Sequence, residues 1–319
     1  MKKFTKVLGT IALSCGIGAF AYKKIGEKFY EYALSAKGID KMRGADEIGG
    51  DVKEVIVTSD YVAQGRAWFN DSENELLHIK SSLSDEIPAL LYKLPEATNR
   101  WAIVCHGYAS KPSDMGVFGK IFASQGFNVI LPTMRGHADS PCEYTGMGWV
   151  ERLDVISLVE YIIEQDPDAQ IVLFGVSMGA ACVLMTTGEK LPENVVCAVA
   201  DCGYTSIWDI FTVQIKNIFH LPPFPFLDAA NSVFKKKSGF DLKDGSAVEQ
   251  VKKSCTPTLF IHGCDDDFVP FYMLDEIYNS AACEKEKYAV ENAAHAVASL
   301  VAEDEYTDRV VNFINKYLK

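Results

Sequence analysis

Short apolar runs separated by polar, glycine-containing turns follow one another along most of the chain. Such runs are typical of strands, and they lie at residues 55–57, 77–79, 89–92, 101–105, 128–131, 171–174, 195–200, 258–261 and 287–290. Apolar positions at helical spacing predict helices over residues 113–125, 149–164 and 296–318, and from about residue 178. This alternation predicts an α/β fold with a mostly parallel central sheet, an antiparallel start at its first three strands, and helices on both faces.

Residues 205–250 interrupt this alternation. Prolines at positions 222, 223 and 225 prevent one continuous helix there. The stretch is rich in aromatic residues, which are Trp208, Phe211, Phe219, Phe224, Phe226 and Phe234. These side chains form a satellite core under a long connection or line a cap over a pocket, and the two interpretations are compatible. Because about 45 residues are too few for a second core, we expect one domain over 51–319 with a short cap insertion at about 205–250.

The N-terminus has the pattern of a targeting or anchoring segment. Three lysines precede a run of sixteen uncharged residues, 7–22, and the triplet at 19–21 has the small-x-small form of a signal-peptidase site. Residues 1–22 are therefore expected to be a cleaved signal peptide or an uncleaved membrane anchor, since flanking lysines help a short run to span a bilayer. Either alternative places the folded domain outside the cytoplasm, and residues 23–50 are expected to be a connector with a short helix.

Composition narrows the class of protein. Of 319 residues, 48% are hydrophobic and 23% are charged, which excludes a chain that is disordered throughout. The formal charge of −12, with no extended basic run after the N-terminus, argues against a nucleic-acid partner. Nine cysteines without a CxxC pair argue against a structural zinc site. Four of them, Cys105, Cys182, Cys197 and Cys202, lie in or beside apolar segments and are expected to be small buried hydrophobes.

The first motif with chemical meaning is Gly175-Val176-Ser177-Met178-Gly179. It follows the predicted strand 171–174 and opens a predicted helix. A serine on such a tight strand-to-helix turn is presented as a nucleophile, and the flanking glycines permit the close backbone approach that the turn needs.

A second motif, His106-Gly107-Tyr108, follows the predicted strand 101–105. Acyl transfer creates an oxyanion that needs two preorganised N–H donors. In the nucleophile-elbow design one donor is the residue after the serine, here Met178, and the other comes from the loop after an earlier strand, here Tyr108. The His106 side chain is expected to brace the loop by hydrogen bonding.

Two further motifs supply an acid and a base. Asp265, Asp266 and Asp267 follow the predicted strand 258–261, and a carboxylate there can orient a histidine and stabilise its charged form. His295 lies among small residues after the strand at 287–290. The order Ser…Asp…His is that of an elbow-type triad, and all candidates lie past strand ends, at the edge where open α/β sheets place their sites. The residues alone leave the choice among the three aspartates open.

These motifs resemble those of the α/β-hydrolase superfamily, and the chain is similar to bacterial membrane-anchored or secreted hydrolases related to monoacylglycerol lipases and serine aminopeptidases. The resemblance covers about residues 53–319 and rests on His106-Gly107-Tyr108, residues 135–140, the Gly175 to Gly179 motif, His262-Gly263 with Asp266, Val269-Pro270 and His295. It implies an α/β-hydrolase fold in which Asp266, three residues after Gly263, is the acid. It also implies that Arg135 and Asp139 belong to a loop that braces the site.

The expected activity is hydrolysis of carboxylic esters with small to medium apolar acyl or aryl groups, through an acyl-enzyme on Ser177. The alternatives are a serine peptidase or amidase and a non-catalytic surface protein on the same fold. This mechanism needs no metal ion and no organic cofactor. The expected partners are a small-molecule ester and, if the N-terminal segment is uncleaved, the membrane.

Overall fold

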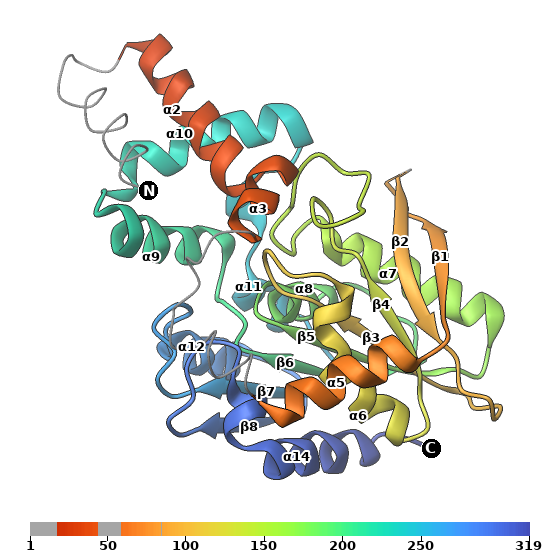
Figure 1. The fold of residues 1–319 in the computed structure, drawn as a ribbon. Helices are drawn as coiled ribbons and strands as arrows, with labels where there is room; N and C mark the ends of the chain where they lie inside the picture. The colour runs from red at the N-terminus through yellow and green to blue at the C-terminus, as the bar shows by residue number, and fades with distance from the viewer. Residues whose placement is uncertain (1–17, 44–58, 84) are drawn as a thin grey trace.

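The computed structural model describes residues 18–43, 59–83 and 85–319. The expected signal or anchor falls largely on residues 1–17, and the expected strand at 55–57 falls on residues 44–58. Both lie outside the described residues. In the described part an eight-stranded sheet has helices on both faces (Figure 1).

The sheet has the order β1-β2-β4-β3-β5-β6-β7-β8. Its strands are β1 (Asn74–Lys80), β2 (Glu86–Tyr92), β3 (Arg100–Cys105), β4 (Asn128–Pro132), β5 (Gln170–Val176), β6 (Val195–Asp201), β7 (Thr258–Gly263) and β8 (Lys285–Val290). Strand β2 pairs antiparallel with both β1 and β4, and all other pairs are parallel. The predicted mostly parallel sheet with an antiparallel start is therefore confirmed. Every residue of β4 and β5 is buried, as their continuous apolar runs require.

Two layers of helices cover the sheet, and each layer has its own hydrophobic core. One core contains side chains from α7 (Glu151–Gln165), α8 (Met178–Thr187), α11 (Ala247–Val251) and α12 (Tyr272–Ser280). The other contains side chains from α6 (Gly116–Ser124), α13 (Ala298–Val301) and α14 (Glu303–Asn315), with the short 3₁₀ turn η1 (Pro112–Met115) beside α6. The helix expected over 296–318 is thus divided at Ala302, whose φ of −109° and ψ of 2° are not helical.

The insertion contributes two helices, α9 (Ile207–Phe219) and α10 (Pro223–Ser238), followed by the 3₁₀ turn η2 (Leu242–Asp244). As the prolines predict, there is no continuous helix: α9 ends at His220, which is left-handed, and Phe224 has an extended backbone at the start of α10. Phe219 and Phe226 are buried in a satellite core between the helices, whereas Phe224 is 73% exposed.

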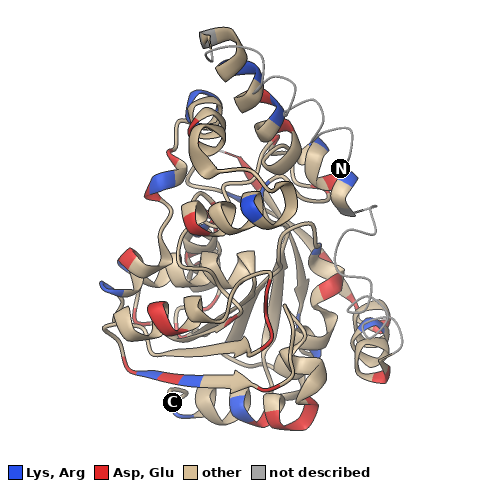
Figure 2. Cartoon of the chain, turned by 90° about the vertical axis from the view of Figure 1, so that its left-hand side faces the viewer, with Lys and Arg blue, Asp and Glu red and all other residues tan. Residues whose placement is uncertain are grey.

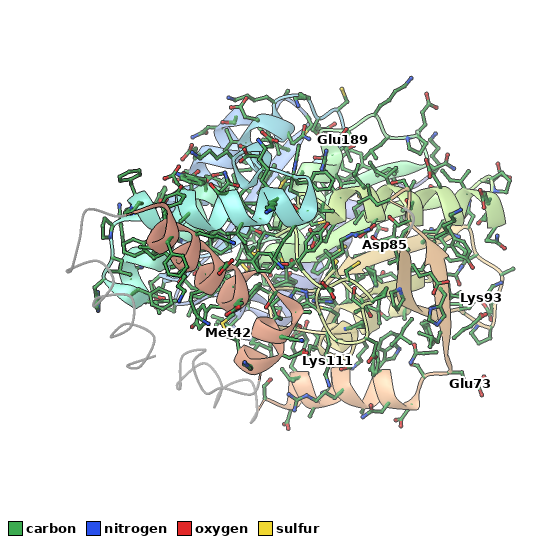
Figure 3. All side chains as sticks on the ribbon, turned by 90° about the horizontal axis from the view of Figure 1, so that it is seen from above. Met42, Glu73, Asp85, Lys93, Lys111 and Glu189 are labelled. Atoms are coloured by element: carbon green, nitrogen blue, oxygen red, sulfur yellow. The ribbon has the colours of Figure 1, made fainter. Side chains whose placement is uncertain are left out.

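The N-terminal segment packs against this insertion, and two helices fall largely within the range 23–50 that was expected to be a connector with a short helix. Helices α2 (Ala19–Ala33) and α3 (Ala36–Arg43) precede the sheet, and α2 runs alongside α10 (Figures 1 and 3). Ile25 and Phe29, one helical turn apart, enter the satellite core. The two helices lie close together because Gly26 has no side chain: a Cβ there would lie 2.2 Å from the Ala229 carbonyl oxygen.

Helix α5 (Asp60–Asp71), which the sequence analysis did not predict, packs on the outside of α6. Charged residues of both signs are interspersed over the outer helices, while the inner strands are almost free of them (Figure 2). Within the described part of the chain, no helix is both long and apolar enough to cross a bilayer.

Candidate active site

Ser177 sits on a strained turn between β5 and α8. Its φ of 55° and ψ of −116° lie in a region that L-residues rarely adopt, and its N–H donates to the Asp201 carbonyl of β6 at 2.8 Å. Such a conformation lifts the side chain above the carboxyl end of the sheet, where β5 ends. The side chain is 8% exposed, so its hydroxyl is shielded from bulk water.

The two flanking glycines are required by close contacts. A Cβ at Gly175 would lie 2.3 Å from the carbonyl carbon of Gly179, and a Cβ at Gly179 would lie 2.2 Å from the Cys105 carbonyl oxygen. Real Cβ atoms do not approach backbone this closely. The sequence motif therefore encodes the geometry that presents Ser177, as expected for a nucleophile elbow.

The structure brings His295 to this serine. The Ser177 Oγ and the His295 Nε2 are 2.9 Å apart, although the residues are separated by 118 positions. His295 lies in the loop between β8 and α13, and Asn292 and Ala296 in that loop both have a φ of 58°. The loop is tied to the one after β7, because the Asp265 N–H donates to the Ala293 carbonyl at 3.0 Å.

Asp266 completes a hydrogen-bonded chain. Its Oδ2 lies 2.7 Å from the His295 Nδ1, and its Oδ1 accepts the N–H groups of Phe268 at 3.0 Å and Val269 at 2.8 Å. Asp266 is 4% exposed, whereas Asp265 and Asp267 are exposed to solvent. The structure therefore places only one of the three consecutive carboxylates against the imidazole.

A second histidine contacts the same carboxylate. The His262 Nε2 lies 2.8 Å from the Val269 carbonyl oxygen and 3.2 Å from the Asp266 Oδ2. Burial opposes ionisation of Asp266, but the hydrogen bonds from His262 and His295 outweigh it and lower the pKa of that carboxyl below its ordinary value. The sequence analysis missed this role of His262. The only sequence signal for the role was the position of His262 next to Gly263 at the end of β7.

The loop after β3 lies beside the elbow, because β3 and β5 are neighbours with Cys105 paired to Gly175. A Cβ at Gly107 would lie 3.4 Å from the Ser177 Cβ and 4.0 Å from its Oγ. Among the residues that the structure describes, no hydrogen-bond partner is found for the N–H of Tyr108 or Met178.

His106 braces this loop, as expected. Its ring nitrogens bond to the backbone at both ends: Nδ1 lies 2.8 Å from the Gly107 carbonyl oxygen, and Nε2 accepts the Met134 N–H at 3.1 Å. Because Nε2 is an acceptor, the proton of the neutral ring resides on Nδ1 and is donated to Gly107. The imidazole is fully buried.

The next loop is held by buried charge. The Arg135 guanidinium pairs with Asp154 at 2.6 Å and with Asp85 at 2.7 Å. Further along, the Glu151 carboxylate accepts the N–H groups of Gly146 at 2.7 Å and Gly148 at 2.8 Å. These contacts fix the course of residues 134–148, which pass beside the elbow.

Solved structures that resemble this chain include an esterase and a peptidase. The chain is similar to the esterase Pf2001 of Pyrococcus furiosus, with a TM-score of 0.63 and 21% identity over 78% of this chain and 92% of that one. A puromycin-hydrolyzing peptidase of Mycobacterium tuberculosis has a TM-score of 0.60 and 15% identity, over 77% of this chain and 39% of that one. The chain has the α/β-hydrolase fold.

Sequence comparison agrees with this fold. The model of the family "Serine aminopeptidase, S33" matches residues 97–220 of this chain. YqkD of Bacillus subtilis is 25% identical over 222 residues, which cover 69% of this chain and 73% of YqkD. YfhR of Escherichia coli O157:H7 is 24% identical over 66% of this chain and 69% of its own length. The family match includes Ser177 and ends before Asp266 and His295.

One group of potential metal ligands occurs in the described part of this chain. Atoms of Cys202, Asp266 and His295 lie within 4.8 Å of one another. Asp266 and His295 already bond to each other in the hydrogen-bonded chain that begins at Ser177. Burial raises the pKa of the Cys202 thiol well above its ordinary value, which disfavours the thiolate that a metal requires. These residues therefore fit the hydrogen-bonded chain better than a metal centre.

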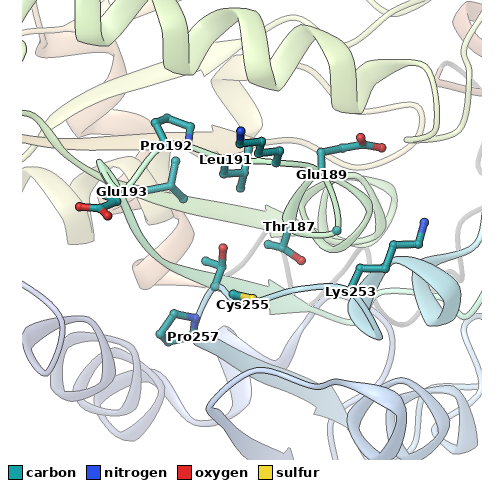
Figure 4. A pocket seen from close by; sticks show the side chains of 12 residues that line it. Thr187, Glu189, Leu191, Pro192, Glu193, Lys253, Cys255 and Pro257 are labelled. Atoms are coloured by element: carbon teal, nitrogen blue, oxygen red, sulfur yellow. The ribbon is translucent and has the colours of Figure 1, made fainter.

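A hollow of about 520 Å³ lies at the other edge of the sheet (Figure 4). Its lining comes from the turns before β6 and β7, between residues 187 and 195 and between 253 and 257. Because these strands are parallel to β5, their starts are at the edge opposite to Ser177. This hollow is separate from the candidate active site.

Proposed function

We propose that this chain is a serine hydrolase that cleaves carboxylic esters with small to medium apolar acyl or aryl groups. The observation that carries the proposal is the continuous hydrogen-bonded chain from Ser177 through His295 to Asp266, built on a strained elbow. Three residues from three different loops meet at the carboxyl edge of the sheet, which is where this fold places its chemistry.

The geometry supports two-step acyl transfer. The His295 Nε2 takes the Ser177 proton as the Oγ attacks the ester carbonyl, and Asp266 holds the imidazole in the required tautomer and stabilises its charged form. The N–H groups of Tyr108 and Met178 stabilise the oxyanion of the tetrahedral intermediate. His295 then protonates the leaving alcohol, and a water molecule activated by the same imidazole hydrolyses the acyl-enzyme.

Apolar surface beside the imidazole supports an apolar substrate. The ring of Phe268 packs against the His295 ring with centroids 4.9 Å apart, and it is 40% exposed. The cap reaches the same point, because the Gln214 amide of α9 donates to the Phe268 carbonyl at 2.6 Å. An acyl or aryl group bound at Ser177 would therefore lie under α9, with an aromatic ring on one side.

The proposal is tested with a fluorophosphonate probe and the variant Ser177→Ala. The wild-type protein should be labelled and should hydrolyse p-nitrophenyl esters, and Ser177→Ala should lose labelling and about 10³-fold or more in turnover, as triad serines do. Ser232→Ala, which removes an exposed hydroxyl from α10, is the matched control and should behave as wild type. Near-normal turnover by a folded Ser177→Ala protein would refute the mechanism.

A substrate panel separates esters from amides, which matters because the matching family model is that of a serine aminopeptidase. Each methylene buried in an apolar pocket contributes about 0.8 kcal/mol, so kcat/KM should rise about threefold to fourfold per CH₂ from acetyl esters until the pocket is full. A flat profile from acetyl to octanoyl esters would contradict the apolar pocket. A preference for aminoacyl p-nitroanilides would assign the chain to the peptidases.

A further inference from the structure

The backbone between α2 and α3 is bound to the loop after β4. This α2–α3 joint, residues 33–36, forms an isolated antiparallel bridge between Ser35 and Tyr144. The Thr145 N–H donates to the Leu34 carbonyl at 2.9 Å, and the Ala36 N–H donates to the Glu143 carbonyl at 2.9 Å. Main-chain bonds on both sides of the bridge fix the joint in one register against that loop.

The same joint contacts the loop that carries the first oxyanion donor. The Tyr108 hydroxyl donates to the Ala33 carbonyl at 2.9 Å. Burial raises the pKa of the Tyr108 hydroxyl above its ordinary value, so it stays protonated and remains a donor. The Tyr108 ring also packs edge-on against His137 at 5.7 Å, so two contacts fix the direction of its side chain.

The joint also reaches the second donor, through one intermediate residue. The Thr145 that donates its N–H to Leu34 has its Oγ1 3.6 Å from the Met178 Sδ. Met178 is completely buried and begins α8, directly after Ser177. One joint thus contacts the side chain of Tyr108 directly and that of Met178 through Thr145.

The joint itself is held firmly in the fold. Leu34 is 1% exposed and Tyr30 is 6% exposed, and both belong to the main hydrophobic core, while the Lys237 ammonium of α10 lies 4.8 Å above the Tyr30 ring. A flexible tether could not hold its contacts in place, but a buried joint can. The N-terminal helices are therefore suited to positioning groups in the site.

We propose that the α2–α3 joint holds the Tyr108 and Met178 N–H groups in the geometry of the oxyanion hole, with the Tyr108 side chain as a positioning residue. The proposal deepens the proposed serine hydrolase and rests on it. Tyr108 and Met178 come from loops after different strands, β3 and β5, and their N–H groups must point at one oxygen. A common contact with both segments reduces their independent movement, which is what a preorganised site requires.

Tyr108→Phe tests the contact, with Tyr61→Phe as the matched control. Tyr61 is also half-buried, and its hydroxyl bonds to Thr307 at 3.4 Å, between α5 and α14. In Tyr108→Phe kcat should fall about 10-fold with KM little changed. Loss of a whole oxyanion donor lowers kcat about 10²–10³-fold, and this substitution only makes the position of one donor less fixed. Binding of a trifluoromethyl ketone, which forms an oxyanion on the serine, should weaken by a similar factor.

Ala36→Pro tests the joint from the other side. It removes the N–H group that donates to the Glu143 carbonyl. Proline is well tolerated here because Ala36 is the first residue of α3 and because the preceding Ser35 already lies in an extended bridge. We expect the same pattern as in Tyr108→Phe, with a smaller loss of kcat and of affinity for the ketone.

Each outcome decides the matter. Loss of kcat and of ketone affinity in Tyr108→Phe, with labelling retained and Tyr61→Phe unchanged, supports the proposal. Wild-type kcat and ketone affinity in Tyr108→Phe would overturn the proposal and leave the serine hydrolase intact. A loss of kcat and ketone affinity that Tyr61→Phe shows equally would also overturn it. A wild-type protein that neither takes up fluorophosphonate nor hydrolyses any ester refutes the proposed function and this inference with it.

Discussion

At the scale of single residues, three consecutive carboxylates show how burial assigns a role. Asp266 points inward, receives two backbone N–H groups on one oxygen and faces two histidines with the other. Asp265 and Asp267 are exposed to solvent. The partners of Asp266 stabilise its charged form beside His295, which becomes an imidazolium in the proposed reaction.

Asp266→Asn should therefore lower kcat by about 10⁴-fold, because an amide stabilises the wrong tautomer of the histidine. Asp265→Asn and Asp267→Asn are the matched controls and should stay within about twofold of wild type, as exposed substitutions do. The pKa of Asp266 is lowered, so its carboxylate is ionised at every pH above the ordinary pKa of an aspartate. A rise of kcat between pH 5 and 8 must therefore come from the titration of a group other than Asp266. A larger loss at position 265 or 267 would reassign the acid.

The sequence revealed these residues unequally, for a physical reason. Ser177 lies between glycines that local close contacts demand, so its position could be read from five consecutive residues. Asp266 could be selected only through the family spacing, because nothing local distinguishes it from its neighbours. His262 was missed, since its contact with Asp266 arises from the turn after β7 and not from any sequence pattern.

At the scale of elements, one buried carboxylate, that of Glu151, determines the conformation of the loop before α7. Glu151 accepts N–H groups from Gly146 and Gly148 and the Thr145 hydroxyl, and the loop includes left-handed residues at Met147 (φ 51°) and Gly148 (φ 85°). No regular ladder supports such a backbone. The loop keeps its course because the carboxylate satisfies donors that would otherwise be buried without partners.

Glu151→Gln should lower the free energy of unfolding by about 1–3 kcal/mol, because the amide nitrogen cannot accept the Gly148 N–H. Urea unfolding of the purified protein measures the effect. Glu160→Gln, an exposed change on the same helix α7, is the control and should not shift the urea midpoint. Equal midpoints for the two variants would show that the carboxylate does not stabilise the loop.

Strands β4, β5 and β7 could be predicted because each contains a continuous apolar run and is buried on both faces. Helices α2 and α5 were harder, since each buries only one side and carries many polar residues. The apolar stripe of α2 could be recognised only with its partner, because Ile25 and Phe29 pack against α9 and α10 from distant parts of the chain.

At the scale of the whole molecule, the aromatic content of the insertion has a structural explanation. Phe219 and Phe226 pack with Phe29 of α2, and the rings of Phe29 and Phe219 meet edge-on at 5.7 Å. The satellite core is thus built from both the insertion and the N-terminal helix α2. The half-buried Phe211 and the exposed part of Phe268 remain as the aromatic surface closer to the sheet.

We propose that the N-terminal segment attaches the protein to a membrane, with the hydrolase domain outside the cytoplasm. The packing of α2 against the insertion helps to choose between a cleaved signal peptide and an uncleaved anchor. Cleavage after the triplet at 19–21 would fall inside α2 (Ala19–Ala33) and remove its first turn. The contacts of α2 with the satellite core begin at Tyr22, directly after that triplet, and those with the main core begin at Tyr30. We therefore favour an uncleaved anchor that continues into the cap helix.

Full-length protein should sediment with membranes, be digested by protease added to intact cells, and retain its original N-terminus on sequencing. A variant that lacks residues 2–17 should remain in the supernatant and keep kcat/KM on p-nitrophenyl esters within about twofold, because α2 and its contacts are intact. A matched variant that lacks residues 2–36 also loses the α2–α3 joint and should lose activity. Recovery of all full-length protein from the cytosol would refute the attachment, and an N-terminus at Tyr22 would show that the segment is a cleaved signal.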